Sequence, residues 1–259
     1  MNIKDVVDLE KHPLTDAAFK TSARATLDQA GVLVLKGFLK PASIAAVKAE
    51  GEEHKHHAFY CAEQHNVYLT PPDTGFDADH PRNRQVVSSK GCITDDIVPA
   101  SSHLRVIYDS KIFRDFLCEV LDEEALYEYA DPLSSVNIHY AEPGKELGWH
   151  FDNSSFAITL MIEPPSRGGA FEYIGGMRDA DNGEMNFDGV GKVLDGDVEP
   201  EQLSMPPGAL VLFRGRNAIH RVAPVEGETT RMLVVLAYNS APGVALSESA
   251  RMTFYGRLE

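Results

Sequence analysis

The sequence is poor in cysteine and in basic residues, and each shortage excludes a class of protein. Its three cysteines, Cys61, Cys92 and Cys118, lie far apart and form no C-x-x-C pair. Neither a disulfide framework nor a cysteine-based zinc site is therefore expected. The 24 lysines and arginines face 39 acidic residues, which gives a formal net charge of −15. Such an acidic chain repels phosphate backbones and anionic lipids, so we expect neither a nucleic acid nor a membrane as partner.

Long apolar runs and several common catalytic motifs are missing as well. No stretch has the length of a membrane span, and the first residues, Met1–Asp5, contain no apolar core of a signal peptide. We therefore expect a cytoplasmic protein, and the sequence is compatible with a homo-oligomer. The Gly-x-Ser-x-Gly elbow of serine hydrolases is absent, and no glycine-rich phosphate loop is present. The expected partner is a small-molecule substrate.

The 259 residues are enough for one large β-domain with helical additions, and we expect one domain over residues 1–259. Helical spacing dominates up to about residue 130, and short apolar runs separated by Gly and Pro turns dominate from about 131 to 259. This order predicts a mainly β fold with a helical N-terminal layer, namely a double-stranded β-helix (jelly-roll or cupin-like) barrel. Residues 61–99 are expected to be irregular and to cover a site. Helices are expected at 15–29, from 41 through 47 and at 104–120, and strands at 32–35, 134–140, 149–151, 156–162, 170–174, 209–213 and 232–238.

The most informative motif is His150-Phe151-Asp152, in an otherwise apolar stretch, together with His220 further along the chain. Alternate residues of a strand project from the same face, so His150 and Asp152 are expected to point the same way. His220 follows another strand-like run and could join them. Two histidines and one carboxylate form the facial triad that holds a non-haem Fe(II) while leaving coordination positions open. A surface His beside a surface Asp is the plainer alternative for H-x-D alone.

Arg231 opens the apolar run that follows His220. A 2-oxo acid that chelates iron has a second carboxylate to be held, and the guanidinium group binds a carboxylate through two parallel hydrogen bonds. We therefore expect Arg231 to anchor 2-oxoglutarate. In the alternative, Arg231 lies on the outer face of its strand and pairs with a nearby glutamate. Three other arginines compete for the anchor role: Arg214, Arg216 and Arg221.

The motifs together resemble the Fe(II)/2-oxoglutarate-dependent oxygenases of the double-stranded β-helix fold. More closely, the chain is similar to radical halogenases and hydroxylases that act on free amino acids, typified by lysine halogenases. The resemblance covers most of residues 25–257. The segments that carry it are Ala130-Asp131-Pro132-Leu133, Gly148-Trp149-His150-Phe151-Asp152-Asn153, Pro207-Gly208-Ala209-Leu210, Leu212-Phe213-Arg214-Gly215, His220-Arg221-Val222, Arg231, Ser247-Glu248-Ser249-Ala250 and Thr253-Phe254-Tyr255-Gly256-Arg257.

The resemblance implies Fe(II), 2-oxoglutarate and O2 as cofactor and cosubstrates, with His150, Asp152 and His220 as metal ligands. Halogenases of this family carry a small residue where Asp152 stands, and chloride binds the iron there. The resemblance therefore implies a hydroxylase of a free amino acid, with lysine or ornithine favoured. Three alternatives remain: a halogenase, a non-catalytic cupin that binds a metal or ligand, and a zinc hydrolase with the same ligands.

Several further residues are weaker candidates. Asn153 and Tyr255 are expected to contact the substrate, Asn153 because it follows Asp152 and Tyr255 because relatives place an aromatic residue in the matching segment. Arg84, with Arg82 beside it, could meet a carboxylate and is the second cofactor-binding candidate. A turn asparagine, a packing tyrosine and solvated arginines are the plainer interpretations. The histidines at 54, 56 and 57 suggest a second metal site, although a solvated helix end explains them more simply.

Overall fold

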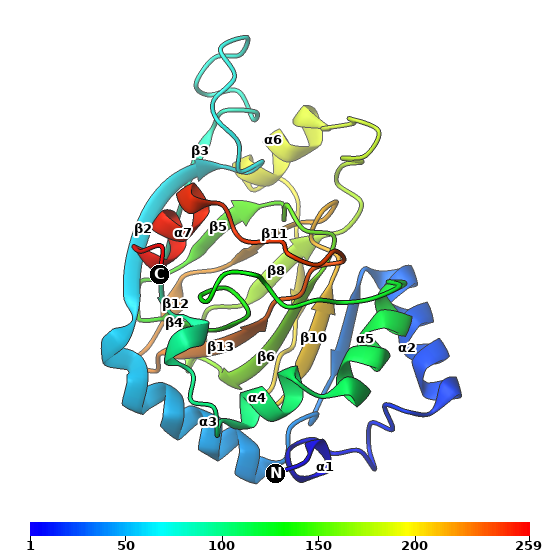
Figure 1. The fold of residues 1–259 in the computed structure, drawn as a ribbon. Coiled ribbons are helices and arrows are strands. Elements are labelled where there is room, and N and C mark those ends of the chain that lie inside the picture. Colours follow the sequence, from blue (N-terminus) through cyan, green and yellow to red (C-terminus); the bar gives the residue numbers. More distant parts are fainter.

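A curled antiparallel sheet forms the body of the protein in the computed structural model, which describes residues 1–259. Figure 1 shows the sheet curled around an interior, with α1, α3 and α4 below it and α2 and α5 to its right. The predicted fold class, a mainly β jelly-roll with a helical N-terminal layer, is confirmed. The strands follow one another across the sheet in this order: β1 (Val32–Leu35), β10 (Leu210–Phe213), β6 (Ala157–Glu163), β13 (Arg231–Leu236), β4 (Val136–Ala141), β3 (Gln85–Ile93), β5 (Leu147–His150), β11 (Ile219–Val222), β8 (Phe171–Ile174) and β9 (Glu201–Leu203), with β2 (Phe59–Asn66) paired to β3. A separate pair joins β12 (Val225–Glu226) to β7 (Arg167–Gly168).

Alternation along the strands gives the sheet two different faces. Ile138, Leu160 and Val234 belong to the main hydrophobic core, which the helices complete. Their neighbours His139 and Leu233 line an interior cavity instead. The same period of two residues thus divides strands such as β4 and β13 between a helix-covered core and the cavity that holds the candidate site.

The helices lie outside this sheet, and none of them has the length and apolar character needed to cross a membrane. Helix α5 has a strongly apolar face, with Phe113, Phe116 and Leu117 fully buried. The expected helix at 104–120 is in fact two helices, because the Ser110 hydroxyl accepts a hydrogen bond from the Phe113 amide and starts a new helix. The helices are α1 (Ile3–Val6), α2 (Ala17–Ala30), α3 (Pro41–His54), α4 (His103–Tyr108), α5 (Lys111–Leu121), α6 (Phe187–Asp195) and α7 (Glu248–Tyr255).

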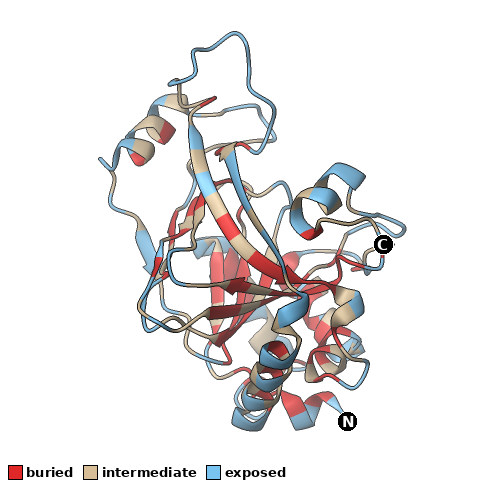
Figure 2. Cartoon of the chain, turned by 90° about the vertical axis from the view of Figure 1, so that its left-hand side faces the viewer, coloured by how far each residue is buried: buried red, intermediate tan, exposed pale blue.

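The expectation of an irregular segment over residues 61–99 is confirmed for the connection at 67–84 and is wrong for the strands on either side of it. Strands β2 and β3 form a long ribbon there, with eight residue pairs in register from Phe59–Cys92 to Asn66–Gln85. Only the connection between the two strands is irregular. Figure 2 shows the ribbon rising from a buried base to an exposed tip. Most residues of β2 are exposed, so the sequence shows no apolar alternation there.

Candidate metal centre

Two neighbouring strands bring the predicted ligands together. His150 is the last residue of β5, and it lies directly across from His220 of β11 in the antiparallel register. Asp152 follows β5 by two residues, and its amide donates to the Gly215 carbonyl at 3.1 Å. The possible ligand atoms of His150, Asp152 and His220 all lie within 4.8 Å of one another.

Hydrogen bonds to the backbone orient both imidazoles. His150 Nδ1 lies 2.8 Å from the Gly148 carbonyl, and His220 Nδ1 lies 3.0 Å from the Ala218 carbonyl. A carbonyl only accepts, so each Nδ1 carries the hydrogen and each Nε2 keeps its lone pair. The Nε2 atoms of His150 and His220 lie 3.8 and 3.5 Å from Asp152 Oδ1. Both lone pairs are therefore available to a cation at the carboxylate.

The protonation states suit a metal as well. Burial, followed by the neighbouring His220, lowers the pKa of His150 to about 3. Burial alone would raise the pKa of the Asp152 carboxyl, but the adjacent histidines outweigh it and hold that pKa below its ordinary value. A neutral imidazole and an ionised carboxylate are the forms that bind a metal, so no proton has to be displaced.

Gly215 makes room for the carboxylate ligand. A Cβ atom at this position would overlap Oδ2 of Asp152 and would come within 3.0 Å of His220 Cε1. The absence of a side chain at Gly215 is therefore a steric requirement of the Asp152 position. Sequence reasoning missed this glycine, because only the fold places it under Asp152.

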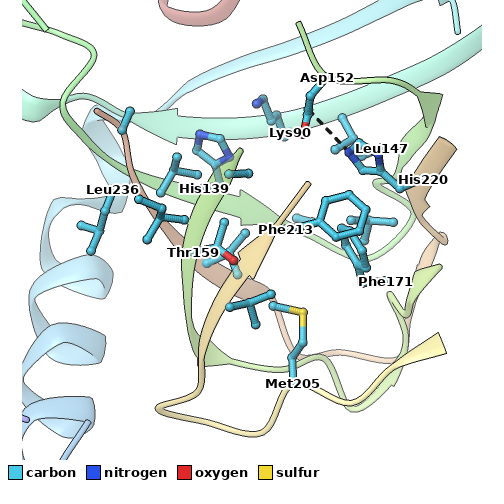
Figure 3. A pocket seen from close by; sticks show the side chains of 18 of the residues that line it. Lys90, His139, Leu147, Asp152, Thr159, Phe171, Met205, Phe213, His220 and Leu236 are labelled. Atoms are coloured by element: carbon cyan, nitrogen blue, oxygen red, sulfur yellow. Dashed lines mark ion pairs between the residues drawn. The ribbon is translucent and has the colours of Figure 1, made fainter. Parts of the chain in front are cut away.

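A cavity of about 340 Å³ extends from this cluster into the curled sheet. Figure 3 shows the labelled side chains that line it, with Asp152 and His220 on one side and Met205 on the other. Most of the lining is apolar, including Phe171, Phe213 and Leu233. A largely apolar cavity with a few polar groups is typical of a small-molecule site.

Arg231 lines the same cavity, and its side chain is buried without any hydrogen bond or ion pair from the protein. Burial lowers the pKa of its guanidinium from 12.5 to about 10. A buried cation that has no partner is costly unless a ligand supplies one. The three competing arginines are instead held in ion pairs: Arg214 with Asp28, Arg216 with Asp181 and Arg221 with Glu172.

Two further polar residues of the cavity were not assigned a role by the sequence. Lys90 makes no ion pair, and its Nζ lies 5.3 Å from the centre of the Phe254 ring. Figure 3 shows Lys90 near Asp152, and His139 between Lys90 and Leu236. Burial holds the pKa of His139 well below 6.5, with Lys90 and Arg231 adding to the effect. The Lys90 ammonium group, beside the His-Asp-His cluster, is thus left without an acidic partner.

The remaining sequence candidates lie away from the cavity lining. Asn153 is exposed, and its carbonyl accepts from Arg216 at 3.1 Å. Tyr255 is the buried last residue of α7, and its hydroxyl donates to Asn137 Oδ1 at 3.0 Å. Arg84 bonds to Asp195 and to the Leu194 carbonyl of α6. The histidines at 54, 56 and 57 lie at the exposed end of α3 and are not part of any metal-binding cluster.

Residues 15–253 match the family Halogenase D (HalD). No curated protein matches the chain. Among solved structures, a 2OG-Fe(II) oxygenase-family oxidoreductase from Burkholderia pseudomallei is similar, with a TM-score of 0.56 and 13% identity over 87% of this chain and 92% of that one. A Pseudomonas putida prolyl-4-hydroxylase has a TM-score of 0.52 and 13% identity over 83% of this chain and 96% of its own.

A third similar structure is the non-heme alpha ketoglutarate dependent epimerase SnoN from nogalamycin biosynthesis. It has a TM-score of 0.59 and 14% identity over 86% of this chain and 84% of its own. SnoN has also been crystallised with Fe3+, alpha ketoglutarate and nogalamycin RO. At these identities the likenesses show a shared fold, that of the 2-oxoglutarate-dependent oxygenases.

Proposed function

This chain belongs to the Halogenase D family, and we propose that it hydroxylates an unactivated C–H bond of a free amino acid. Its fold and its His-Asp-His cluster are those of a 2-oxoglutarate-dependent non-haem iron oxygenase. The observation that carries the choice of hydroxylation is Asp152, whose ionised carboxylate completes the cluster.

The residues fit Fe(II) by the chemistry of their donors. Two imidazole Nε2 atoms with free lone pairs and one carboxylate oxygen converge from one side, and this set is typical of non-haem Fe(II) oxygenases. The backbone carbonyls of Gly148 and Ala218 fix both rings, which is the usual support of metal-binding histidines. Bound Fe(II), with 2-oxoglutarate and O2, supplies the oxidising power that the side chains lack.

Arg231 is the proposed partner for the far carboxylate of 2-oxoglutarate. Its guanidinium is buried in the cavity that starts at the metal cluster and has no acid of its own. A carboxylate bound there would satisfy the unpaired donors and offset the cost of burying the charge. The side chain would thereby orient the cosubstrate towards the cluster and exclude water from its far end.

The substrate is proposed to bind between Lys90 and Glu146. Both line the cavity, and neither side chain makes a hydrogen bond or ion pair within the protein. Lys90 could hold the carboxylate of an amino acid and Glu146 an ammonium group, which would suit lysine or ornithine. Asn153 and Tyr255 remain weaker proposals for substrate contact, because neither lines the cavity.

Halogenation is the second candidate, because the family is described as Halogenase D. Halide would need the coordination position that the Asp152 carboxylate takes. For this reason we favour hydroxylation. A non-catalytic metal-binding cupin and a zinc hydrolase with the same ligands are outcomes of the test below.

The test is incubation of the purified protein with Fe(II), ascorbate, 2-oxoglutarate, O2, chloride and a pool of free amino acids. Mass spectrometry then follows succinate and the mass of each amino acid. We expect one amino acid to gain a single oxygen, with matching succinate. A chlorinated product would establish the halogenase. Bound iron without any succinate would favour the non-catalytic cupin, and oxygen-independent hydrolysis with zinc would favour the hydrolase.

A further inference from the structure

Three chain segments that are far apart in the sequence meet behind Asp152. The first is the turn after β5, which carries Asp152 and Asn153. The second is the turn before β11 at residues 215–217. The third is the start of the insertion between β8 and α6, at residues 177–180, whose amides at Met177 and Ala180 bond to the backbone and side chain of Asn217. The insertion is therefore joined to the turn that leads to His220.

Arg178 connects all three segments. Its Nε donates to the Arg216 carbonyl at 2.7 Å, and its Nη2 donates to the carbonyl of Asp152 itself at 3.4 Å. Its guanidinium also lies 4.1 Å from the ring centre of Phe151, in cation–π geometry. Arg178 makes no ion pair with any carboxylate. Both hydrogen bonds of its head group are thus made to the two turns that carry the candidate metal site.

We propose that Arg178 is a positioning residue for the metal: by bridging the Asp152 and Arg216 carbonyls and covering Phe151, it holds the Asp152 carboxylate at the coordination site. The inference rests on the proposed function, because it concerns the same iron centre. It also gives the insertion between β8 and α6 a role in metal binding.

The need for such a bridge follows from the position of Asp152. Residue 152 lies beyond the last residue of β5, so the sheet ladder no longer fixes it. Apart from Arg178, the turn is held by three bonds: the Phe151 amide donates to the Val67 carbonyl, the Asp152 amide to the Gly215 carbonyl, and Arg216 to the Asn153 carbonyl. A planar guanidinium can serve two acceptors and stack on a ring at once, whereas a lysine ammonium on a flexible stem cannot.

The test compares metal binding to the wild type, Arg178→Lys, Arg178→Gln and the control Arg214→Gln. Arg214 lies one residue from the Gly215 turn but pairs with Asp28, away from the cluster. Co(II), followed by its visible absorption, serves as the probe, and thermal unfolding of the metal-free proteins reports on folding. Residues that support metal ligands typically change metal affinity about 10- to 100-fold when they are replaced. We expect such a loss in both Arg178 variants and no change in the control.

A double-variant cycle separates positioning from general damage. If Arg178 acts through Asp152, Arg178→Lys should cost almost nothing further in an Asp152→Ala background. Additive losses there, wild-type affinity in both Arg178 variants, or losses that only follow lower thermal stability would each overturn the inference. The proposed function fails separately, in the turnover assay: a wild type that binds Co(II) or Fe(II) but adds oxygen to no amino acid would refute the hydroxylase and leave the Arg178 inference standing.

Discussion

Arg231→Met should make the ligand-free protein more stable while removing its response to 2-oxoglutarate. The Arg231 side chain is 5% exposed and has no partner. Its pKa falls from 12.5 to about 10 through burial, which corresponds to a burial cost of about 3 kcal/mol at neutral pH, since one pKa unit is about 1.4 kcal/mol. Methionine has a similar length and no charge, so we expect it to recover about 1–3 kcal/mol of this cost. The midpoint of thermal unfolding should rise by about 2–4 °C for each kcal/mol recovered.

Addition of 2-oxoglutarate should cancel or reverse the difference in stability. The wild type, loaded with Mn(II) under anaerobic conditions, should gain about 2.7 kcal/mol at a concentration one hundred times the dissociation constant. Arg231→Met should gain little, because its cavity offers no cation for the far carboxylate. Urea unfolding with and without 2-oxoglutarate measures both effects on the same samples.

A paired arginine provides the control. Arg105 donates to Asp95 Oδ1 at 2.6 Å and to the Val98 carbonyl at 3.1 Å. Arg105→Met should therefore destabilise the protein and leave its response to 2-oxoglutarate intact. The reasoning would be refuted if Arg231→Met were less stable than the wild type and still gained the full increment from 2-oxoglutarate.

Three further substitutions test other parts of the structure. Gly215→Ala should lower Co(II) affinity at least tenfold without unfolding the protein, because its methyl group displaces the Asp152 carboxylate; unchanged affinity in a Co(II) titration would contradict the steric argument. Lys90→Met should raise the KM for the amino acid and leave the KM for 2-oxoglutarate unchanged. Steady-state kinetics, with the amino acid and 2-oxoglutarate varied in turn, measure both constants; a raised KM for 2-oxoglutarate alone would contradict the prediction. Burial raises the pKa of Glu50, which accepts from Ser102 at 2.8 Å. The folded protein therefore binds this proton more tightly than the unfolded chain, so Glu50→Gln should stabilise the protein near pH 7 in urea unfolding, and the gain should vanish below pH 4.5.

The candidate metal ligands could be predicted from the sequence because most of their arrangement depends on strand periodicity. The alternation of an extended chain predicts a common face for His150 and Asp152, and the strand-like run before His220 predicts a second strand beside them. Asp152 in fact lies two residues past the end of β5, where its amide donates to the Gly215 carbonyl. The structure brings all three together. The position of Arg231 could be narrowed to two alternatives from the sequence in the same way. A charged residue at the start of an apolar strand faces either outward, where it pairs with an acidic residue, or inward, where it has no partner.

Lys90, Gly215 and Arg178 could not be predicted, because their roles depend on contacts between distant segments. Gly215 matters only through its overlap with the Asp152 carboxylate, and Arg178 only through two backbone carbonyls. The β2–β3 ribbon was missed for another reason: β2 is exposed along most of its length, so the apolar alternation that reveals a half-buried strand is absent. Arg84, proposed for a carboxylate ligand, reaches α6 instead.

The family description suggests halogenation, whereas the candidate site suggests hydroxylation. The surroundings of Asp152 favour hydroxylation. Its carboxylate fits only because Gly215 carries no side chain, and nearby histidines hold it ionised in spite of burial. Its backbone is tied to the turn before β11 by its own amide and to the insertion by Arg178. If Asp152 had only taken the place of the small residue that halogenases carry, its surroundings would not be expected to offer steric room, a favourable charge and backbone support together. The agreement of all three supports the proposal that Asp152 is a carboxylate ligand, and with it the proposed hydroxylation over the halogenation that the family description suggests.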